Sequence, residues 1–472
     1  MSEGPTHLDD DSPGQRPEHA DGSVSRRDVL KTFGLGAVAL GAAGVGRNLH
    51  GSQRALPNLM RGQAAGGNVI KIGYVTPETG ALADFSQSDK FVLGKVRASS
   101  AYKKGLRIGG KTYKLEIVVV DSQSSPSRAA QVAQQLVLQN KVNLVVTSSA
   151  PETTNPVTSA CEQLRTPCLS TVVPWESWYA GLGGDPLKPT KAFPYSAMFF
   201  FGMKEFAGTF LPMWQRIEAK THAAKVFAGM FPNDADGNAF RAGFPPYAEK
   251  LGYKFIDGGA YTDGTTNYSS MIEKFKGAGC EFFVNAPLPP DFNTFWKQAV
   301  QEGFRPKLAT VAKVLLFPSD VVALGSLANN IATDAWWTPY GPYRSSLTGE
   351  TAKQFAIDYQ TSTGNEWVQS MGSAYSLFEV AVEALRASQD PHNKAAVAHA
   401  LHNVHYSGMC GPIAFNKGPA PGVGIILPVG IQWRAGNPKY DFGKKYPFQP
   451  YVVDNSLNKH IPLTGDLQAT NP

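Results

Sequence analysis

Short apolar runs alternate with amphipathic helical stretches along most of the chain. Residues 69–75 and 115–120 are rich in β-branched side chains, a pattern typical of parallel strands that are buried on both faces. Residues 125–140 instead repeat apolar side chains at helical spacing and begin with a Ser-Pro pair that suits a helix start. Residues 142–147 and 168–173 return to the strand pattern. The first half therefore predicts alternating strands and helices.

The second half repeats this alternation. Its predicted strands are residues 225–231, 281–286, 307–311 and 425–433, and its predicted helices cover residues 292–300, which Gly303 ends, and residues 374–385. Alternating strands and helices with right-handed crossovers form open, doubly wound sheets, whose ligands bind beyond the carboxyl ends of the strands. We therefore predict an α/β fold with two Rossmann-like lobes, each built on a parallel sheet, and a cleft between them.

Composition supports two ordinary globular cores. The chain has 472 residues, of which 42% are hydrophobic and 17% charged. The formal charge of +6 is spread along the sequence without a lysine or arginine block, so no nucleic-acid partner is predicted. No apolar run is long enough to span a membrane. Of the four cysteines, Cys161 and Cys168 either form a disulfide across a short connection or remain buried thiols.

The first 65 residues are predicted to be an export signal and a disordered leader. Residues 1–24 are polar and acidic, whereas residues 33–46 are weakly apolar and rich in glycine and alanine. Between them stand the paired arginines Arg26 and Arg27, which resemble a twin-arginine signal. This resemblance implies the twin-arginine export machinery as a partner and a location in the periplasm or at the extracellular face of the cell membrane.

Motifs for catalysis, cofactors or metals are weak or missing. The Gly34-x-Gly36-x-x-Ala39 spacing fits a dinucleotide fingerprint, but no strand precedes it and no acidic residue follows it. His399, His402 and His405 recur every three residues without an acidic or thiol ligand beside them. We therefore predict no catalytic residue, no cofactor and no metal site.

Four motifs follow one another in a defined order between residues 69 and 433. They are Ile70-Lys71-Ile72-Gly73 with Pro77-x-Thr79-Gly80, the strand 115–121 with its capped helix, Lys297-Gln298-Ala299 with Phe304-x-Pro306, and Gly411-Pro412-Ile413-x-Phe415 with Gln432-Trp433. This order resembles the type I periplasmic solute-binding proteins of ABC transporters, in particular the branched-chain amino-acid (leucine/isoleucine/valine) binding family.

The resemblance implies two discontinuous lobes joined by a three-stranded hinge. The chain is expected to cross between the lobes near residues 194–199, 336–339 and 409–412. The predicted domains are an N-terminal lobe of residues 66–197 plus 340–408, a C-terminal lobe of residues 198–339 plus 409–450, and a tail of residues 451–472.

Candidate binding residues in the first lobe follow its strands. Ser148 and Ser149 end one predicted strand, and Ser170 and Thr171 lie in the next, where hydroxyls and free amides suit a small polar group. The resemblance implies that Ser149 and Thr171 hold the main polar group of the ligand. Ordinary turn chemistry also favours serine and threonine at such positions. Phe85 is a candidate aromatic wall that could equally be core. The other candidate aromatic surfaces are Trp175, Trp178 and the pair Trp336-Trp337, although a tryptophan taken alone more often packs in the core.

Candidate binding residues in the second lobe are Asp236, Thr265 and Asn285. Thr265 stands where the related amino-acid binders place an acidic residue that pairs with the ammonium group of the ligand. A desolvated ammonium without a carboxylate partner is costly. The ligand is therefore not expected to be an α-amino acid unless Asp236 or Asp263 supplies that carboxylate.

The resemblance implies an ABC-importer binding protein that captures a small polar solute by hinge closure and delivers it to a membrane permease. Two alternatives remain at this point. One is an exported enzyme, because twin-arginine export carries folded cofactor enzymes. The other is a ligand-sensing receptor domain of the same fold.

Overall fold

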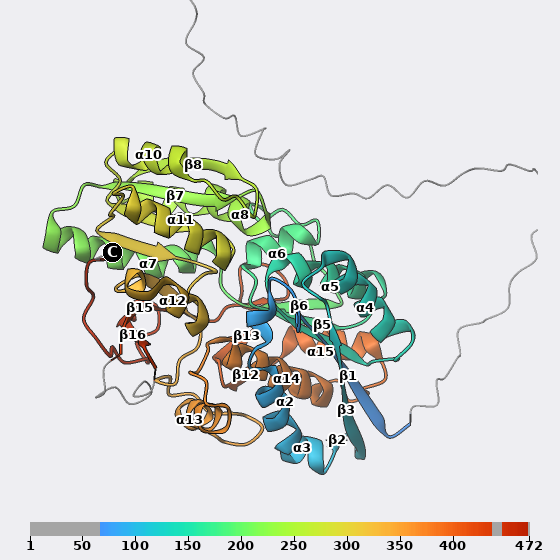
Figure 1. Ribbon diagram of the computed structural model, residues 1–472. Helices are drawn as coiled ribbons and strands as arrows, with labels where there is room; N and C mark the ends of the chain where they lie inside the picture. The colour runs from blue at the N-terminus through green and yellow to red at the C-terminus, as the bar shows by residue number, and fades with distance from the viewer. Residues whose placement is uncertain (1–66, 437–445, 471–472) are drawn as a thin grey trace, which may run out of the picture. The chain divides into compact units, whose positions relative to one another are not determined.

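The computed structural model describes residues 67–436 and 446–470 (Figure 1). The predicted export signal lies outside the described residues. Within them, no helix combines the length and apolar character that a membrane span requires. The cysteines are buried and unbridged, so Cys161 and Cys168 are present as thiols.

The first lobe is built on a seven-stranded sheet with the order β14-β6-β5-β4-β1-β3-β2. All neighbouring strands run parallel except β2 and β3. Parallel neighbouring strands need a crossover connection, which is usually a helix. The alternation of strands and helices in the sequence supplies these connections. The strands are β1 (Val69–Thr76), β2 (Leu106–Ile108), β3 (Lys111–Asp121), β4 (Leu144–Ser148), β5 (Cys168–Thr171), β6 (Ser196–Phe199) and β14 (Val423–Gly424).

Helices cover both faces of this sheet. The face of α4 that the sequence predicted is buried with α5 against one side, where Ser125 accepts a hydrogen bond from the Arg128 amide and Pro126 begins the helix. α2 and the almost wholly buried α14 cover the other side. The helices of this lobe are η1 (Ala83–Ser86), α2 (Asp89–Ala98), α3 (Ser100–Lys103), α4 (Pro126–Leu138), α5 (Pro151–Gln163), α6 (Trp175–Gly181), α13 (Ala352–Thr363), α14 (Ser370–Ala387) and α15 (Lys394–Asn403).

The second lobe has a seven-stranded sheet with the order β16-β15-β11-β10-β9-β7-β8. Five of its strands run parallel, and β15 and β16 are added antiparallel at one edge. α7 packs on one face, and α10, α11 and α12 surround a second apolar cluster on the other. The strands are β7 (Val226–Pro232), β8 (Lys254–Tyr261), β9 (Phe282–Asn285), β10 (Leu308–Val311), β11 (Ala332–Ala335), β15 (Val429–Ala435) and β16 (Phe448–Asp454).

The remaining elements complete the second lobe and the join between lobes. A short antiparallel hairpin pairs β12 (His405–Gly408) with β13 (Gly411–Ala414). The helices are α7 (Met203–Thr221), α8 (Ala235–Gly243), α9 (Pro245–Glu249), α10 (Ser269–Gly277), α11 (Pro289–Gln301), α12 (Pro318–Leu324) and η2 (Gly325–Ala328).

The chain passes from one sheet to the other at three places, and two of the predicted boundaries need correction. The third crossing lies between β14 and β15, not near residues 409–412, because β14 pairs with β6 of the first sheet. Residues 451–454 are not tail but part of β16, and the chain beyond them buries Ile461 and Leu467. β16 is an edge strand that pairs with β15 alone, and such a strand leaves little signal in a sequence that otherwise alternates strands and helices.

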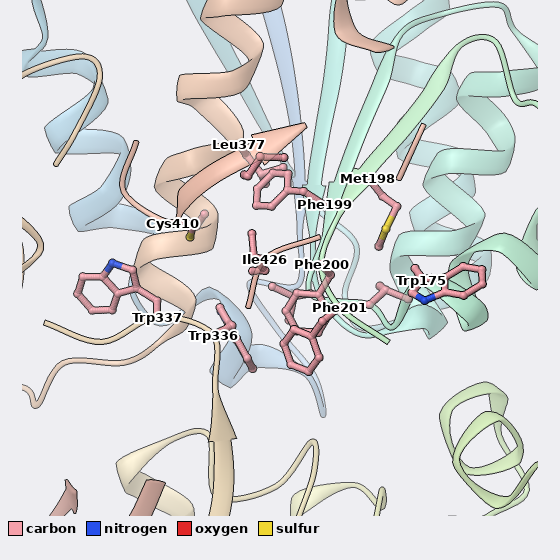
Figure 2. Packing of buried hydrophobic residues seen from close by; sticks show 14 of the residues in the cluster. Trp175, Met198, Phe199, Phe200, Phe201, Trp336, Trp337, Leu377, Cys410 and Ile426 are labelled. Carbon is pink, nitrogen blue, oxygen red and sulfur yellow. The ribbon is translucent and has the colours of Figure 1, made fainter. Parts of the chain in front are cut away.

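Side chains from all three crossings meet. Phe200 follows β6, Trp336 follows β11, and Ile426 lies between β14 and β15. The rings of Phe200 and Trp336 are 5.1 Å apart, and Figure 2 shows Ile426 beside Phe200. The hinge region therefore has an apolar, aromatic core.

Candidate functional site

A small cavity lies between the carboxyl ends of the two sheets. Turns after β4, β5 and β6 line it from the first lobe, and α8, the turn after β10 and the end of β11 line it from the second. The free volume is about 30 Å³, room for little more than one or two water molecules. Its lining residues are Phe85, Ala150, Val172, Pro174, Phe200, Phe206, Asp236, Phe240, Ala312, Lys313, Leu316, Asp334 and Trp336.

Two of the lining turns carry backbone strain. Val172, directly after β5, has φ 65°, and Lys313, two residues after β10, has φ 66°. Residues with side chains rarely adopt this left-handed conformation, and a β-branched residue such as Val172 does so least readily. Both turns are held in an unfavourable conformation beside a cavity that the two lobes share.

Lys313 is the centre of a buried ionic cluster. Its Nζ lies 2.9 Å from Glu152 Oε1, 3.1 Å from Asp236 Oδ2 and 3.4 Å from Asp234 Oδ2. Burial disfavours the charged ammonium, but the three carboxylates together outweigh it and raise the pKa of Lys313. Burial also raises the pKa of Asp236, to about 7, against the opposing effect of Lys313. Lys313 therefore stays protonated while its partners compete for one positive charge.

Polar and aromatic contacts hold the lobes together beside the cavity. Glu152 belongs to α5 of the first lobe, so its ion pair with Lys313 joins the two lobes. The Ser177 hydroxyl of α6 lies 3.3 Å from Asp236 Oδ1. The rings of Phe85 and Phe317 meet edge to face with centroids 5.0 Å apart. The structure is thus a closed form of the cleft.

Ser149 and Thr171 directly precede the lining residues Ala150 and Val172 but do not line the cavity themselves, and their hydroxyls differ. Ser149 Oγ is buried and has no hydrogen-bond partner in the described part of the chain. Thr171 Oγ1 donates to the Phe199 carbonyl at 2.6 Å, so it is committed to the sheet. Ser170 Oγ lies 2.8 Å from Thr158 Oγ1 of α5, which directs it away from the cavity, and Ser148 is buried at the end of β4 outside the lining.

The three candidate residues of the second lobe also differ in their position relative to the cavity. Asp236 lines the cavity. Asn285 lies just beneath it, where Oδ1 accepts from the Ala312 amide at 3.1 Å and Nδ2 has no partner among residues 67–436 and 446–470. Thr265 does not line the cavity, because its hydroxyl caps the local turn by donating to the Thr262 carbonyl.

Among the aromatic candidates, Phe85 lines the cavity but Trp175 and Trp337 do not. Trp337 is buried against Phe355 and Trp367, and Figure 2 shows its ring directed away from Phe200, whereas the ring of Trp336 lies toward it. The adjacent Trp336 takes the lining position, and its Nε1 donates to Ser373 Oγ at 3.2 Å. An alternating backbone lets only one of two neighbouring tryptophans face the cavity.

The sequence analysis missed Lys313 and Asp334, and it named Trp336 only as one of the pair Trp336-Trp337. Trp336 and Asp334 lie at the end of β11, a strand that the sequence pattern did not mark. Lys313 follows β10, which was predicted, and the rule that ligands bind beyond the carboxyl ends of strands could have singled it out. The three histidines are not part of this site, and no three His, Cys, Asp or Glu residues of the described chain are placed to hold a metal ion.

Two facing Rossmann-like lobes with a shared cavity define a two-lobe binding-protein fold. The family model of the periplasmic binding proteins matches residues 69–421. The chain therefore belongs to the periplasmic binding protein family.

Solved structures of low sequence identity share the fold. The leucine binding protein LivK of Thermotoga maritima is 16% identical with a TM-score of 0.62, over 77% of this chain and 95% of that one. The branched-chain amino acid transporter substrate binding protein LivJ of Streptococcus pneumoniae, in complex with isoleucine, is 18% identical with a TM-score of 0.61, over 82% and 99%. A solute binding protein of an ABC transporter from Rhodopseudomonas palustris, in complex with 3,4-dihydroxybenzoic acid, is 15% identical with a TM-score of 0.63, over 83% and 100%.

Proposed function

We propose that the protein captures a small solute between its lobes by hinge closure and delivers it to the membrane permease of an ABC importer. The observation that carries this proposal is the cavity that both lobes line and that interlobe contacts close. A hinge with three chain crossings allows the lobes to separate as bodies, and a ligand that contacts both lobes favours the closed form.

The proposal places the protein outside the cytoplasm and assigns it no chemical step. Export through the twin-arginine machinery, on the strength of Arg26 and Arg27, is part of it. The cavity needs only to bind and release. Related structures hold an amino acid in one case and an aromatic acid in another, so the ligand class must be found by experiment.

A thermal-shift screen of the purified protein tests the function. We expect at least one clear rise in the unfolding midpoint across amino acids, amides, aromatic acids and quaternary amines. A ligand that binds only the folded state at a concentration 100 times its Kd adds about 2.7 kcal/mol to the free energy of unfolding. If no compound of the four classes raised the unfolding midpoint and the protein converted any one of them to a product, it would instead be an enzyme.

A pair of serine substitutions tests where that ligand binds. Ser149→Ala removes a buried hydroxyl that has no partner in the described structure, so we expect weaker binding with little change in stability. Ser170→Ala is the matched control, because its hydroxyl bonds to Thr158 and faces away from the cavity. Calorimetric titration of the screen's best ligand should separate them by several-fold in Kd. Equal Kd values for both variants would place the ligand elsewhere.

A further inference from the structure

Asp334 is a buried carboxylate at the cavity, and one of its two oxygens lacks a hydrogen-bond partner. It stands in β11 between β10 and β15, is 1% exposed, and lines the cavity. Its Oδ1 has no hydrogen-bond partner among the residues that the structure describes. A buried carboxylate oxygen without a donor is costly, and native proteins seldom retain one without a reason.

Hydrogen bonds hold the backbone around Asp334 in place at the cavity wall. The Gln369 side chain of α14 donates to the Asp334 carbonyl at 3.2 Å and accepts from the Trp336 amide at 3.0 Å. The strand itself is paired with Gly430 of β15 on one side. Asp334 is therefore anchored through its backbone at the cavity that it lines.

The cavity offers no free positive charge to an anionic ligand. Of the described residues that line it, only Lys313 is a cation, and Lys313 already serves three carboxylates at 2.9–3.4 Å. Asp334 adds a further carboxylate to the lining. A ligand carboxylate would therefore enter a site in which negative groups outnumber positive ones.

The rest of the lining is apolar, and half of it is aromatic. Rings with a negative π face attract a cation that comes within about 6 Å, most strongly when water is excluded. Two of them, Phe200 and Trp336, pack edge to face with 5.1 Å between centroids (Figure 2). The rings that line the cavity are Phe85, Phe200, Phe206, Phe240 and Trp336.

We infer that the cleft selects a small organic cation, and that Asp334 pairs with its positive charge while the aromatic rings enclose its apolar part. The inference rests on the proposed function and specifies the ligand class for it. Because the free volume of the closed form is about 30 Å³, the cation enters an open cleft and takes space that side chains now fill.

The pH dependence of cation binding gives an independent test of the role of Asp334. Burial raises the pKa of Asp334 to about 7. A bound cation requires the ionised carboxylate, so its affinity should fall by about tenfold per pH unit below 7 and level off above 7. The other titratable groups of the lining are Asp236 and Lys313, which pair with each other at 3.1 Å.

The experiment compares charged and uncharged probes on two matched variants. The probes are choline, phenethylamine, the uncharged choline isostere 3,3-dimethylbutan-1-ol, isoleucine and benzoate, titrated by calorimetry between pH 5.5 and 8.5. The variants are Asp334→Asn and the control Asp320→Asn. Asp320 is also buried in the second lobe, has a carboxylate oxygen without a partner in the described chain and has its pKa raised to about 7 by burial, but does not line the cavity.

We expect at least one cation to bind the wild-type protein. Asp334→Asn should bind that cation at least tenfold more weakly and lose the pH dependence of binding. Asp320→Asn should keep the wild-type Kd and the pH dependence. Equal binding of the uncharged isostere would overturn the inference. Binding of isoleucine or benzoate alone would also overturn it while leaving the solute-binding function intact, and failure of every ligand would remove both. If Asp334→Asn does not fold, the isostere comparison and the wild-type pH profile still decide the question.

Discussion

Replacing Trp214 with alanine is expected to lower the free energy of unfolding of the second lobe by about 3–5 kcal/mol, the usual cost of emptying a large aromatic site. Trp214 is a fully buried residue of α7 that packs against Phe227, Phe244, Tyr253 and Phe282, with ring centroids 5.1–5.6 Å apart. These rings come from separate elements of one lobe, so the cavity left by the substitution cannot close by moving a single side chain.

Urea denaturation followed by circular dichroism measures this loss, with two controls. Trp214→Phe keeps a ring but removes the hydrogen bond from Nε1 to Thr310 Oγ1, 3.0 Å long, and should cost less than the alanine variant. Leu187→Ala, at a side chain that is 79% exposed, should change stability by less than about 0.5 kcal/mol. An alanine variant at position 214 as stable as the Leu187 control would contradict the packing.

Much of the fold could be predicted from the sequence because its signals are local. The alternation of apolar strands with a Ser-Pro-capped helix marked β1, β3, β4 and α4 within a few residues of their observed bounds. The order of motifs then implied two facing lobes, which the family and the sheets confirm. β14 and β16 escaped prediction because their place depends on pairing with strands distant in sequence, which no local pattern records.

The candidate site was less predictable, for a related reason. Of the candidates chosen near strand ends, Phe85 and Asp236 line the cavity and Ser149 stands beside it, and their role in binding stays a prediction. The sequence does not reveal which of the two neighbouring tryptophans faces the cavity. The prediction chose Trp337, whereas Trp336 lines the cavity and Trp337 packs against Trp367. The ionic cluster joins the turn after β10 to α5 and α8, elements far apart in sequence, so the partners of Lys313 could not be read in advance.

Replacing Lys313 with methionine is expected to open the cleft of the empty protein at pH 8. The substitution leaves Glu152 of the first lobe facing Asp234 and Asp236 of the second without the ammonium that they share. Removing one partner of a buried ion pair costs about 3–5 kcal/mol. Separation of the lobes is the cheapest relief, because it returns these carboxylates to water and removes the repulsion between lobes. The closed form should lose about that free energy relative to the open one.

Small-angle X-ray scattering checks this, since an open cleft has the larger radius of gyration. The effect should shrink between pH 8 and pH 5.5, because burial already raises the pKa of Asp236 to about 7 and loss of the opposing Lys313 raises it further. Protonated Asp236 no longer repels Glu152, so acid restores closure. Lys313→Arg keeps the charge and should stay closed, as should Lys307→Met, which changes an exposed lysine beside the same strand. A Lys313→Met variant as compact as the wild type at pH 8 would show that apolar contacts such as Phe85 with Phe317 suffice to hold the lobes, and that a ligand closes the cleft without help from this cluster.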